Sequence, residues 1–324
     1  MLTFYSEQSL TIFHHILIVF ERRPVMAADL HCHTKLSDGS VGIEDLIVIA
    51  QKSGIDTIAI TDHDCLAGTV RGQVIGKRYG VNVIPGVELS AIDSEAGKKV
   101  HILCYLAEKP DRLEGLCKRT SVARKRAGQI MMLKVAARFP VSNDFIINHA
   151  SGSTNLFKQH IMHALMDAGY TDKIFGELYY ALFSRESQTN LLAPVKYPEV
   201  KDVIEEVHNA GGIAVLAHPV LYDNFDEIDK YIELGLDGIE VWHPSASDED
   251  MERLGNICKE NKLLLTGGSD FHGIYGRGTV TLGTCTTPDE HLDKLLSYKA
   301  KKKRAQRKAE KKAALEQAEQ NSEN

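Results

Sequence analysis

Short runs of apolar, mostly β-branched residues recur along the chain and alternate with amphipathic stretches. The runs cover 28–33, 56–61, 81–87, 100–105, 212–217, 237–242 and 262–268. Between them, apolar side chains recur at helical spacing, as at 43–50 before Gly54 and at 203–207 before Gly211 and Gly212. A glycine just past the last periodic residue is typical of a helix end. Strand, helix, strand is the rhythm of a parallel sheet, so the pattern predicts an α/β fold.

Histidines and carboxylates stand at the ends of these runs. A closed or nearly closed barrel presents its chemistry at the carboxyl ends of its strands, and seven runs with polar ends favour a barrel over an open, doubly wound sheet. The sequence contains neither a GxGxxG nor a GxxxxGK[ST] motif that would favour the open sheet. We therefore expect the polar ends to meet at one rim.

The first run ends in DLHCHTKLSDG and offers two histidines two residues apart. Because side chains on a strand repeat every two residues, His31 and His33 lie on one face and can grip one ion together. The alternative is a pair of solvated histidines on an edge strand. Asp38, on the turn that follows, favours the metal site because it supplies a carboxylate nearby.

The next three runs offer His63, Glu88 and His101. Asp62 and Asp64 flank His63 and could fix its tautomer, as partners of metal-bound histidines do, although Asp64 could equally cap a helix. His101 stands at the beginning of its run instead of the end. Either this strand runs in the opposite direction, or His101 is an ordinary half-buried histidine.

The last three runs deliver His218, then Glu240 and His243, then Ser269, Asp270 and His272. Of all these positions, nine have the residue type and placement of a metal ligand, and nine ligands are too many for one ion. The sequence thus predicts a multinuclear metal site. Its members are His31, His33, Asp38, His63, Glu88, His101, His218, Asp270 and His272.

The segments HCHTKLSDG, ITDHD, PGVELS, HILCY, AVLAHP, GIEVWHPS and TGGSDFHG resemble the PHP (polymerase and histidinol phosphatase) family, from about Met26 to about Thr286. Within it the chain is most similar to stand-alone nucleoside 3',5'-bisphosphate phosphatases, some of which trim RNA from its 5' end. The resemblance implies a distorted seven-stranded (β/α) barrel with a trinuclear metal centre. It also implies that all nine residues are ligands, His101 included.

Mixed imidazole and carboxylate ligands suit manganese, zinc or iron, and we expect three ions, with manganese first. Paired ions could lower the pKa of a bridging water, so that hydroxide attacks phosphorus. Glu88 and Asp270 are the best candidates to bridge ions because each carboxylate has two oxygens. We assign catalytic roles to Asp270, Glu88 and His272.

Residues 108–200 do not follow the strand and helix rhythm, so we expect a mostly helical insertion that caps the barrel rim. Arg124-Lys125-Arg126 could clamp a second phosphate, although a short basic run is more often a solvated helix face. Relatives place a basic residue and a histidine where this chain has Lys158 and His160. The expected substrate-binding set is Asp38, Arg124, Lys125, Arg126, Asn155, Lys158, His160 and His243.

The chain departs from the family pattern at two places. Where relatives read close to GRPHIARAL, it has FKQHIMHAL, with Lys158, Gln159 and His163. After AHP, relatives commonly continue with Gly-Arg-Tyr, whereas this chain has Val220-Leu221-Tyr222. Two arginines of the expected substrate shell are replaced. Hydrolysis of a phosphate ester is therefore the firm expectation, and preference for a bisphosphate is open.

Three classes of function remain. The first is a nucleoside 3',5'-bisphosphate 3'-phosphatase, with or without 5'-3' exoribonuclease activity on short RNA. The second is a phosphatase of histidinol phosphate or another small monoester, which shares the metal centre. The third is a non-catalytic PHP module that supports a polymerase; it would lack ligands and carry polymerase sequence, and this chain shows neither.

The termini differ from the rest. We expect 1–25 to be a leader, 26–107 and 201–290 to form the two parts of the barrel, and 291–324 to be a basic tail outside it. From 299 to 312 the tail has net charge +8 against −6 for the whole chain. The tail could bind RNA, but a solubilising end is the more common meaning of such a segment. The six cysteines show no framework spacing, so we expect a cytoplasmic protein with no membrane or protein partner.

Overall fold

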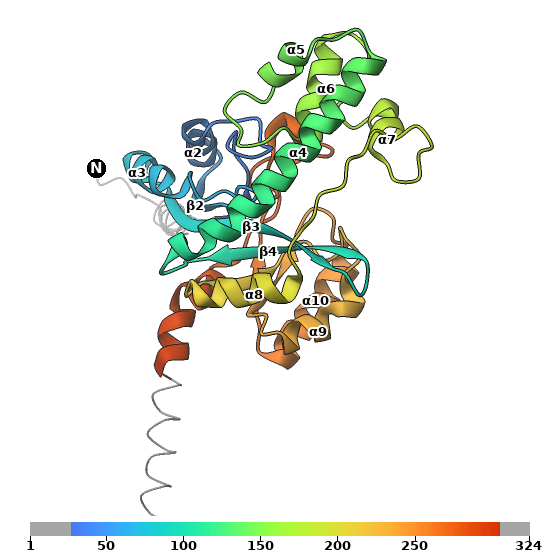
Figure 1. Ribbon diagram of the computed structural model, residues 1–324. Coiled ribbons are helices and arrows are strands. Elements are labelled where there is room, and N and C mark those ends of the chain that lie inside the picture. Colours follow the sequence, from blue (N-terminus) through green and yellow to red (C-terminus); the bar gives the residue numbers. More distant parts are fainter. Residues whose placement is uncertain (1–26, 305–324) are drawn as a thin grey trace, which may run out of the picture.

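The computed structural model describes residues 27–304 (Figure 1). The leader expected at 1–25 and the end of the basic tail lie outside these residues. A seven-stranded mixed sheet with strands in sequence order forms the centre of the molecule, which confirms the predicted α/β fold. Its strands are β1 (Ala27–Cys32), β2 (Ile55–Ile60), β3 (Asn82–Asp93), β4 (Lys98–Tyr105), β5 (Ile213–Leu216), β6 (Gly238–Trp242) and β7 (Leu264–Gly267).

The sheet curves until its two edges approach each other. Cys32 at the end of β1 forms a parallel bridge with Phe271, which follows β7. The His33 backbone N–H also donates a hydrogen bond of 2.9 Å to the carbonyl of Phe271. The ends of the first and last strands therefore meet, and the residues after them share one rim.

Strand β4 runs against its neighbours. It pairs antiparallel with both β3 and β5, whereas the other pairs are parallel. Its beginning therefore lies at the rim where the parallel strands end. This reversal explains why His101 stands early in its run, and it decides between the two interpretations of that position in favour of the rim.

The third strand is longer than its apolar run predicts. The run 81–87 was expected to end at Glu88, but β3 continues to Asp93. Pairing with β2 stops at Pro85, and antiparallel pairing with β4 carries the strand onward from Gly86. Glu88 consequently lies in the middle of a strand, fully buried, with its position fixed by a hairpin.

The barrel interior is filled by apolar side chains from six of the strands, including Leu30, Leu103, Tyr105 and Val215. The alternate residues of the strands point outward and pack against the outer helices. Ile239, for example, belongs to a second apolar cluster on that side. Period-two alternation then places His101 on the inner face, two and four residues before Leu103 and Tyr105. The interior is thus an apolar plug with the polar rim above it.

A helix at 289–304 closes the other end of the barrel. Leu292 and Leu295 are buried in the same interior cluster, and the Tyr298 hydroxyl donates a hydrogen bond of 2.7 Å to Asp237. Lys302 forms a 2.9 Å ion pair with Asp237. The boundary predicted at 291 is therefore wrong for this segment, because apolar residues spaced at helical intervals anchor it to the fold.

Helices cover the outside of the sheet (Figure 1). The predicted amphipathic stretches form α2 and α8, and both bury their apolar faces. None of the helices in residues 27–304 combines the length and the apolar character needed to span a membrane. The elements outside the insertion are α2 (Ile43–Lys52), α3 (Thr69–Tyr79), α8 (Val200–Asn209), η2 (Phe225–Glu227), α9 (Ile228–Glu233), α10 (Asp248–Asn261) and η3 (Gly273–Tyr275).

The insertion predicted at 108–200 is mostly helical up to residue 183 and irregular from 184 to 199. It contains η1 (Pro110–Leu113), α4 (Glu114–Arg138), α5 (Asn143–Asn148), α6 (Lys158–Asp167) and α7 (Glu177–Phe183). These helices share a core of their own, to which Val135, Ile161, Leu165 and Leu182 contribute. Tyr275, from the loop after β7, packs into that core and joins the helices to the barrel rim. We call these helices the cap.

Candidate metal centre

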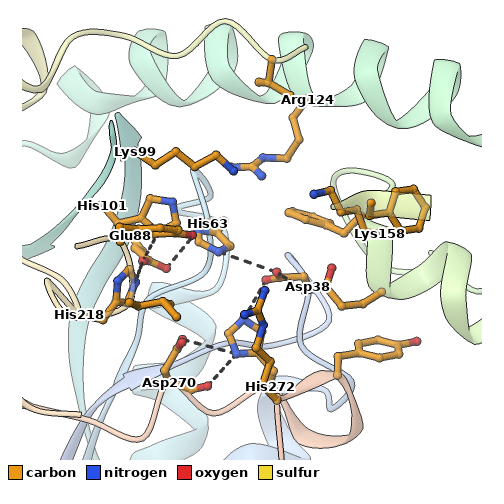
Figure 2. A pocket seen from close by; sticks show the side chains of 18 of the residues that line it. Asp38, His63, Glu88, Lys99, His101, Arg124, Lys158, His218, Asp270 and His272 are labelled. Atoms are coloured by element: carbon orange, nitrogen blue, oxygen red, sulfur yellow. Dashed lines mark hydrogen bonds and ion pairs between the residues drawn. The ribbon is translucent and has the colours of Figure 1, made fainter. Parts of the chain in front are cut away.

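The nine histidines and carboxylates predicted as ligands gather at one rim of the barrel. Figure 2 shows several of them turned toward a common cavity. Three overlapping groups have ligand atoms within 4.8 Å of one another. His33 is shared by the first two groups, and Glu88 by the last two. The groups are His33, Asp38, His63 and His272; His31, His33, Glu88 and Asp270; and His63, Glu88 and His101.

Glu88 is the centre of the cluster. Its Oε1 lies 2.6 Å from His101 Nδ1 and 2.8 Å from His218 Nε2. Its Oε2 lies 3.3 Å from His31 Nε2, 3.2 Å from His33 Nε2 and 3.1 Å from His63 Nδ1. One carboxylate therefore faces five imidazoles, with its two oxygens directed at different sets. This arrangement suits a carboxylate that bridges two ions.

Two further carboxylates extend the cluster. Asp270 Oδ1 lies 3.4 Å from His31 Nε2 and 3.2 Å from His33 Nε2. Asp38 Oδ1 lies 3.3 Å from His272 Nε2, and Asp38 Oδ2 lies 3.8 Å from His63 Nε2. Because His33 faces all three carboxylates and His63 faces two of them, neighbouring ligand groups touch. The spacing is compatible with adjacent ions.

A second set of buried groups holds the imidazoles in place. Glu240 Oε1 lies 2.9 Å from His31 Nδ1, and its Oε2 accepts a 2.8 Å hydrogen bond from the His218 backbone N–H. With Nδ1 occupied in this way, the Nε2 atom of His31 is directed at the cluster. Such partners orient metal-bound histidines in proteins. The sequence placed Glu240 at the end of its strand but did not indicate this task.

The aspartates that flank His63 do not hold its ring, contrary to one of our expectations. Asp62 accepts hydrogen bonds from the Thr34 backbone, at 2.8 Å, and from the Thr34 and Ser37 hydroxyls, at 2.7 and 2.6 Å. It thereby fixes the loop that carries His33 and Asp38. Asp64 is not a helix cap either, because α3 begins later, after Gly68.

Asp64 instead positions an arginine above the cluster. It accepts hydrogen bonds from the Ser90 backbone and hydroxyl, and its Oδ2 lies 3.0 Å from Arg124 Nη2. The same Nη2 donates a 2.6 Å hydrogen bond to the Ser90 hydroxyl. Arg124 comes from α4 of the cap, so this contact ties the cap to the rim.

The electrostatics of the cluster oppose its burial. Burial acts to raise the pKa of the Glu88 carboxyl, but the neighbouring His63, His101 and His31 hold it well below its usual range. Burial likewise disfavours a charged His33, yet hydrogen bonds to Asp270 and Glu88 raise the pKa of its imidazole to about 10. The three carboxylates thus require positive partners, which protons or metal ions can supply.

The residues present fit bound divalent cations. Several buried polar atoms of the cluster lack a hydrogen-bond partner although they face one another, and buried polar atoms are normally paired. They are His31 Nε2, His33 Nε2, Asp38 Oδ1, His63 Nδ1, Glu88 Oε2, His218 Nδ1 and His243 Nε2. Imidazole nitrogens with carboxylate oxygens form the donor set of manganese, iron and zinc sites. These orphaned atoms are where ligand bonds would be made.

A cavity of about 880 Å³ opens between the rim and the cap, and the cluster forms its floor. Five cationic side chains also line it, namely Lys99, Arg124, Lys158, Arg185 and Arg277. Figure 2 shows Arg124, Lys99 and Lys158 on the side opposite Asp270. Aromatic rings complete the wall, and the Arg124 guanidinium lies 5.0 Å from the centre of the Phe157 ring. The cavity can therefore hold an anion larger than one phosphate.

Only part of the predicted substrate-binding set reaches this cavity. Asp38, Arg124, Lys158 and His243 line it. The structure does not bring Lys125 and Arg126 there, because they lie on the exposed side of α4.

Asn155 and His160 are buried and do not line the cavity. The His160 ring accepts a 3.2 Å hydrogen bond from the Phe157 backbone N–H at the start of α6. It therefore stabilises the cap helix that carries Lys158.

Sequence reasoning missed several cavity residues, among them Lys99, Gln159, Arg185 and Arg277. One of them could have been found, because Lys99 precedes His101 by two positions on β4 and so shares its face. Gln159 donates a 3.2 Å hydrogen bond to Asp38. Arg185 and Arg277 come from irregular segments, where no local pattern indicates which way a side chain points.

The rim and the cavity above it define a metal-dependent phosphoesterase, a hydrolase of phosphate esters, and comparisons with known proteins agree. The model of the PHP domain matches residues 29–234. The chain therefore belongs to the PHP domain family, which confirms the resemblance found in the sequence. A solved structure from Bifidobacterium adolescentis, described as a metal-dependent phosphoesterase, has a TM-score of 0.75 and 30% identity. It covers 84% of this chain and 96% of that one.

Two relatives differ in the reaction that their names describe. Phosphoribosyl 1,2-cyclic phosphate 1,2-diphosphodiesterase of Eggerthella lenta is 36% identical over 255 residues, which is 78% of this chain and 96% of that protein. A 5'-3' exoribonuclease of Haemophilus influenzae is 28% identical over 262 residues, which is 79% of this chain and 92% of that protein. The family is common to both, and the substrate is not.

Proposed function

We propose that the chain hydrolyses a phosphate ester of a ribose that carries a second phosphate. The observation that carries this proposal is a single cavity whose floor is the cluster around Glu88 and whose opposite wall presents Arg124, Lys99 and Lys158. A substrate with one phosphate would leave that wall without a partner. With two phosphates, one lies at the cluster and the other at the cations.

The nine predicted residues would hold the metal ions, three in number and manganese first. When bound, such ions lower the pKa of a water molecule and neutralise the charge of phosphoryl oxygens. Asp270 borders the cluster with a partly exposed side chain, so its carboxylate is placed to hold an ion beside the reacting phosphate. His272, with its Nε2 3.3 Å from Asp38, orients that carboxylate.

The second phosphate would be bound from the cap and from β4. Arg124 is held by Asp64 and Ser90, so its guanidinium is fixed before substrate arrives. Preorganised charge of this kind costs less entropy on binding than a free side chain does. Lys99 and Lys158 add charge on either side, while Phe157 and Tyr222 supply surfaces for the sugar or a base.

Two substrates fit this description. The first is a nucleoside 3',5'-bisphosphate, or the 5' end of a short RNA. The aromatic residues of the cavity wall and the similarity to an exoribonuclease support it. The second is a phosphorylated ribosyl cyclic phosphate, and the 36% identity to a protein with that named activity favours it. A small monoester such as histidinol phosphate would use the cluster alone.

A panel of substrates tests the proposal. Manganese-loaded protein is given adenosine 3',5'-bisphosphate, ribosyl 1,2-cyclic phosphate with a 5-phosphate, 5'-phosphorylated RNA, 5'-AMP or histidinol phosphate. Hydrolysis is followed by phosphate release for the monoesters and by chromatography of the products for the cyclic phosphate and the RNA. We expect kcat/KM for the substrates with two phosphates to exceed that for 5'-AMP and histidinol phosphate. Equal values for all five, or a preference for histidinol phosphate, would overturn the role of the cationic wall.

A further inference from the structure

A second cluster of metal-binding side chains lies in the cap, outside the catalytic rim. His149 follows α5 directly, and His163 and Asp167 lie one turn apart on α6. Asp167 Oδ2 is 2.9 Å from His149 Nε2, and Asp167 Oδ1 is 3.7 Å from His163 Nε2. The two imidazole rings are 4.9 Å apart, centre to centre. Two imidazoles and one carboxylate thus converge on one point.

The other nitrogen of each ring is already engaged. His149 Nδ1 lies 2.9 Å from the carbonyl oxygen of Phe145, and His163 Nδ1 lies 2.9 Å from the hydroxyl of Tyr275. Metal-bound histidines have this arrangement, because a partner at one nitrogen fixes the ring and leaves the other nitrogen for the ion. Both Nε2 atoms are consequently directed at Asp167.

We propose that His149, His163 and Asp167 bind one zinc ion, or a similar divalent transition metal, separately from the catalytic cluster. Ligands bound at about 2.0–2.1 Å to a tetrahedral zinc ion lie about 3.3 Å apart. The observed separations of 2.9 and 3.7 Å lie on either side of that value. Half of the Asp167 side chain is exposed, so a fourth position is open to water.

The donor set is what separates this cluster from an ordinary ion pair. His208 and Asp237 also approach to 2.9 Å, but no second imidazole joins them. Among the described residues, four groups combine three or more metal-binding side chains, and the other three belong to the catalytic rim. His208 therefore supplies a matched control for the cap site.

The ion would connect the cap to the catalytic loop. It would fix α6 against the end of α5 and hold the His163 ring, which contacts Tyr275. The short helix η3 begins directly after His272 and ends at Tyr275, which lines the catalytic cavity. The site would thus stabilise the cap in the position in which Lys158 faces the rim. This inference stands on the cap residues alone and does not depend on the substrate proposed above.

Equilibrium dialysis against micromolar zinc, followed by metal analysis, tests the proposal. We expect His149→Gln and His163→Gln to bind one zinc ion fewer per chain than the unaltered protein, and His208→Gln to bind the same number. Asp167→Asn, a change at a half-exposed side chain, should also lose one ion, and it decides the question if a histidine variant does not fold. Zinc content equal to that of the unaltered protein in folded Asp167→Asn and in the folded histidine variants would overturn the proposal.

Discussion

The floor and the wall of the catalytic cavity are built in different ways. The floor consists of short side chains at strand ends, where the backbone is held by the sheet, and Glu88 lies within a buried hairpin. The wall consists of long cationic side chains from the cap, from β4 and from loops. The register of the strands fixes the positions of the floor residues, whereas the positions of the wall residues depend on how the cap packs. We therefore assign the chemistry of the family to the floor, and we propose that specificity resides in the wall.

This difference also decides how much of the molecule could be predicted. Seven apolar runs gave the order of the strands, and the period of two gave the face on which His31, His33 and His101 lie. The same rule could have found Lys99. It could not give the length of β3, because the pairing that extends it comes from β4 and is not visible in the apolar run.

The wall was predicted less well for a physical reason. Arg124, Lys125 and Arg126 are consecutive on α4, and successive residues on a helix point about 100° apart. The three side chains therefore point in different directions, and the sequence does not say which of them faces the cavity. His160 occupies the position at which relatives have a histidine, but its side chain caps α6 instead of facing the substrate. Arg185 and Arg277 lie in irregular segments that carry no periodic signal.

The largest effect should follow from a change in the floor. Replacing Glu88 with Gln removes a negative charge that faces five imidazoles, so we expect bound metal to be lost and kcat/KM to fall by about 10³-fold or more. Asp270→Asn should also abolish turnover while leaving the fold largely intact. Metal analysis, steady-state kinetics and circular dichroism check both variants. Glu260→Gln, at an exposed position on α10, is the control. A Glu88→Gln protein with normal rates would contradict the assignment of catalysis to the floor.

A change in the wall should be smaller and selective. Arg124→Gln loses a charged hydrogen-bond donor, so kcat/KM for a substrate with two phosphates should fall by about 10- to 100-fold. The value for 5'-AMP should change little. Lys125→Gln, one residue along the same helix but exposed, should behave like the unaltered protein. An equal loss on both kinds of substrate would show that Arg124 serves the floor instead of the wall.

The pH dependence of substrate affinity also tests the role of the wall. Burial, with the nearby Lys99, Arg277, Arg185 and Arg124, lowers the pKa of Lys158 to about 8. The lysine is charged below that pH and neutral above it, so attraction for the second phosphate weakens as the pH rises through about 8. We expect KM to rise several-fold on that side, and the rise to be shallower in Lys158→Arg, which stays charged. A pH profile identical in both proteins would contradict this.

A change at the base of the barrel should affect stability without affecting catalysis. Burial raises the pKa of Asp237, but bonds from His208, Ala214, Lys302 and Tyr298 lower it to about 2. A lowered carboxyl pKa contributes stability at neutral pH that is lost as the pH falls from about 4 to about 2. Asp237→Asn should cost about 2 kcal/mol of unfolding free energy near neutral pH and less at low pH.

Urea unfolding at two pH values measures this loss for Asp237→Asn. Because the change lies at the end of the barrel opposite the rim, kcat should remain that of the unaltered protein at temperatures where both are folded. A fall in kcat without a loss of stability would contradict the separation of the base from the catalytic rim.

The most direct test of the account is a crystal structure of the manganese-loaded protein, with anomalous diffraction recorded at the manganese edge. We predict anomalous peaks between the carboxylates of Glu88, Asp270 and Asp38, each surrounded by the histidines named above. If phosphate is included, it should lie between those peaks and Arg124. A map without peaks among these carboxylates, from protein that hydrolyses its substrate in the same conditions, would contradict the account.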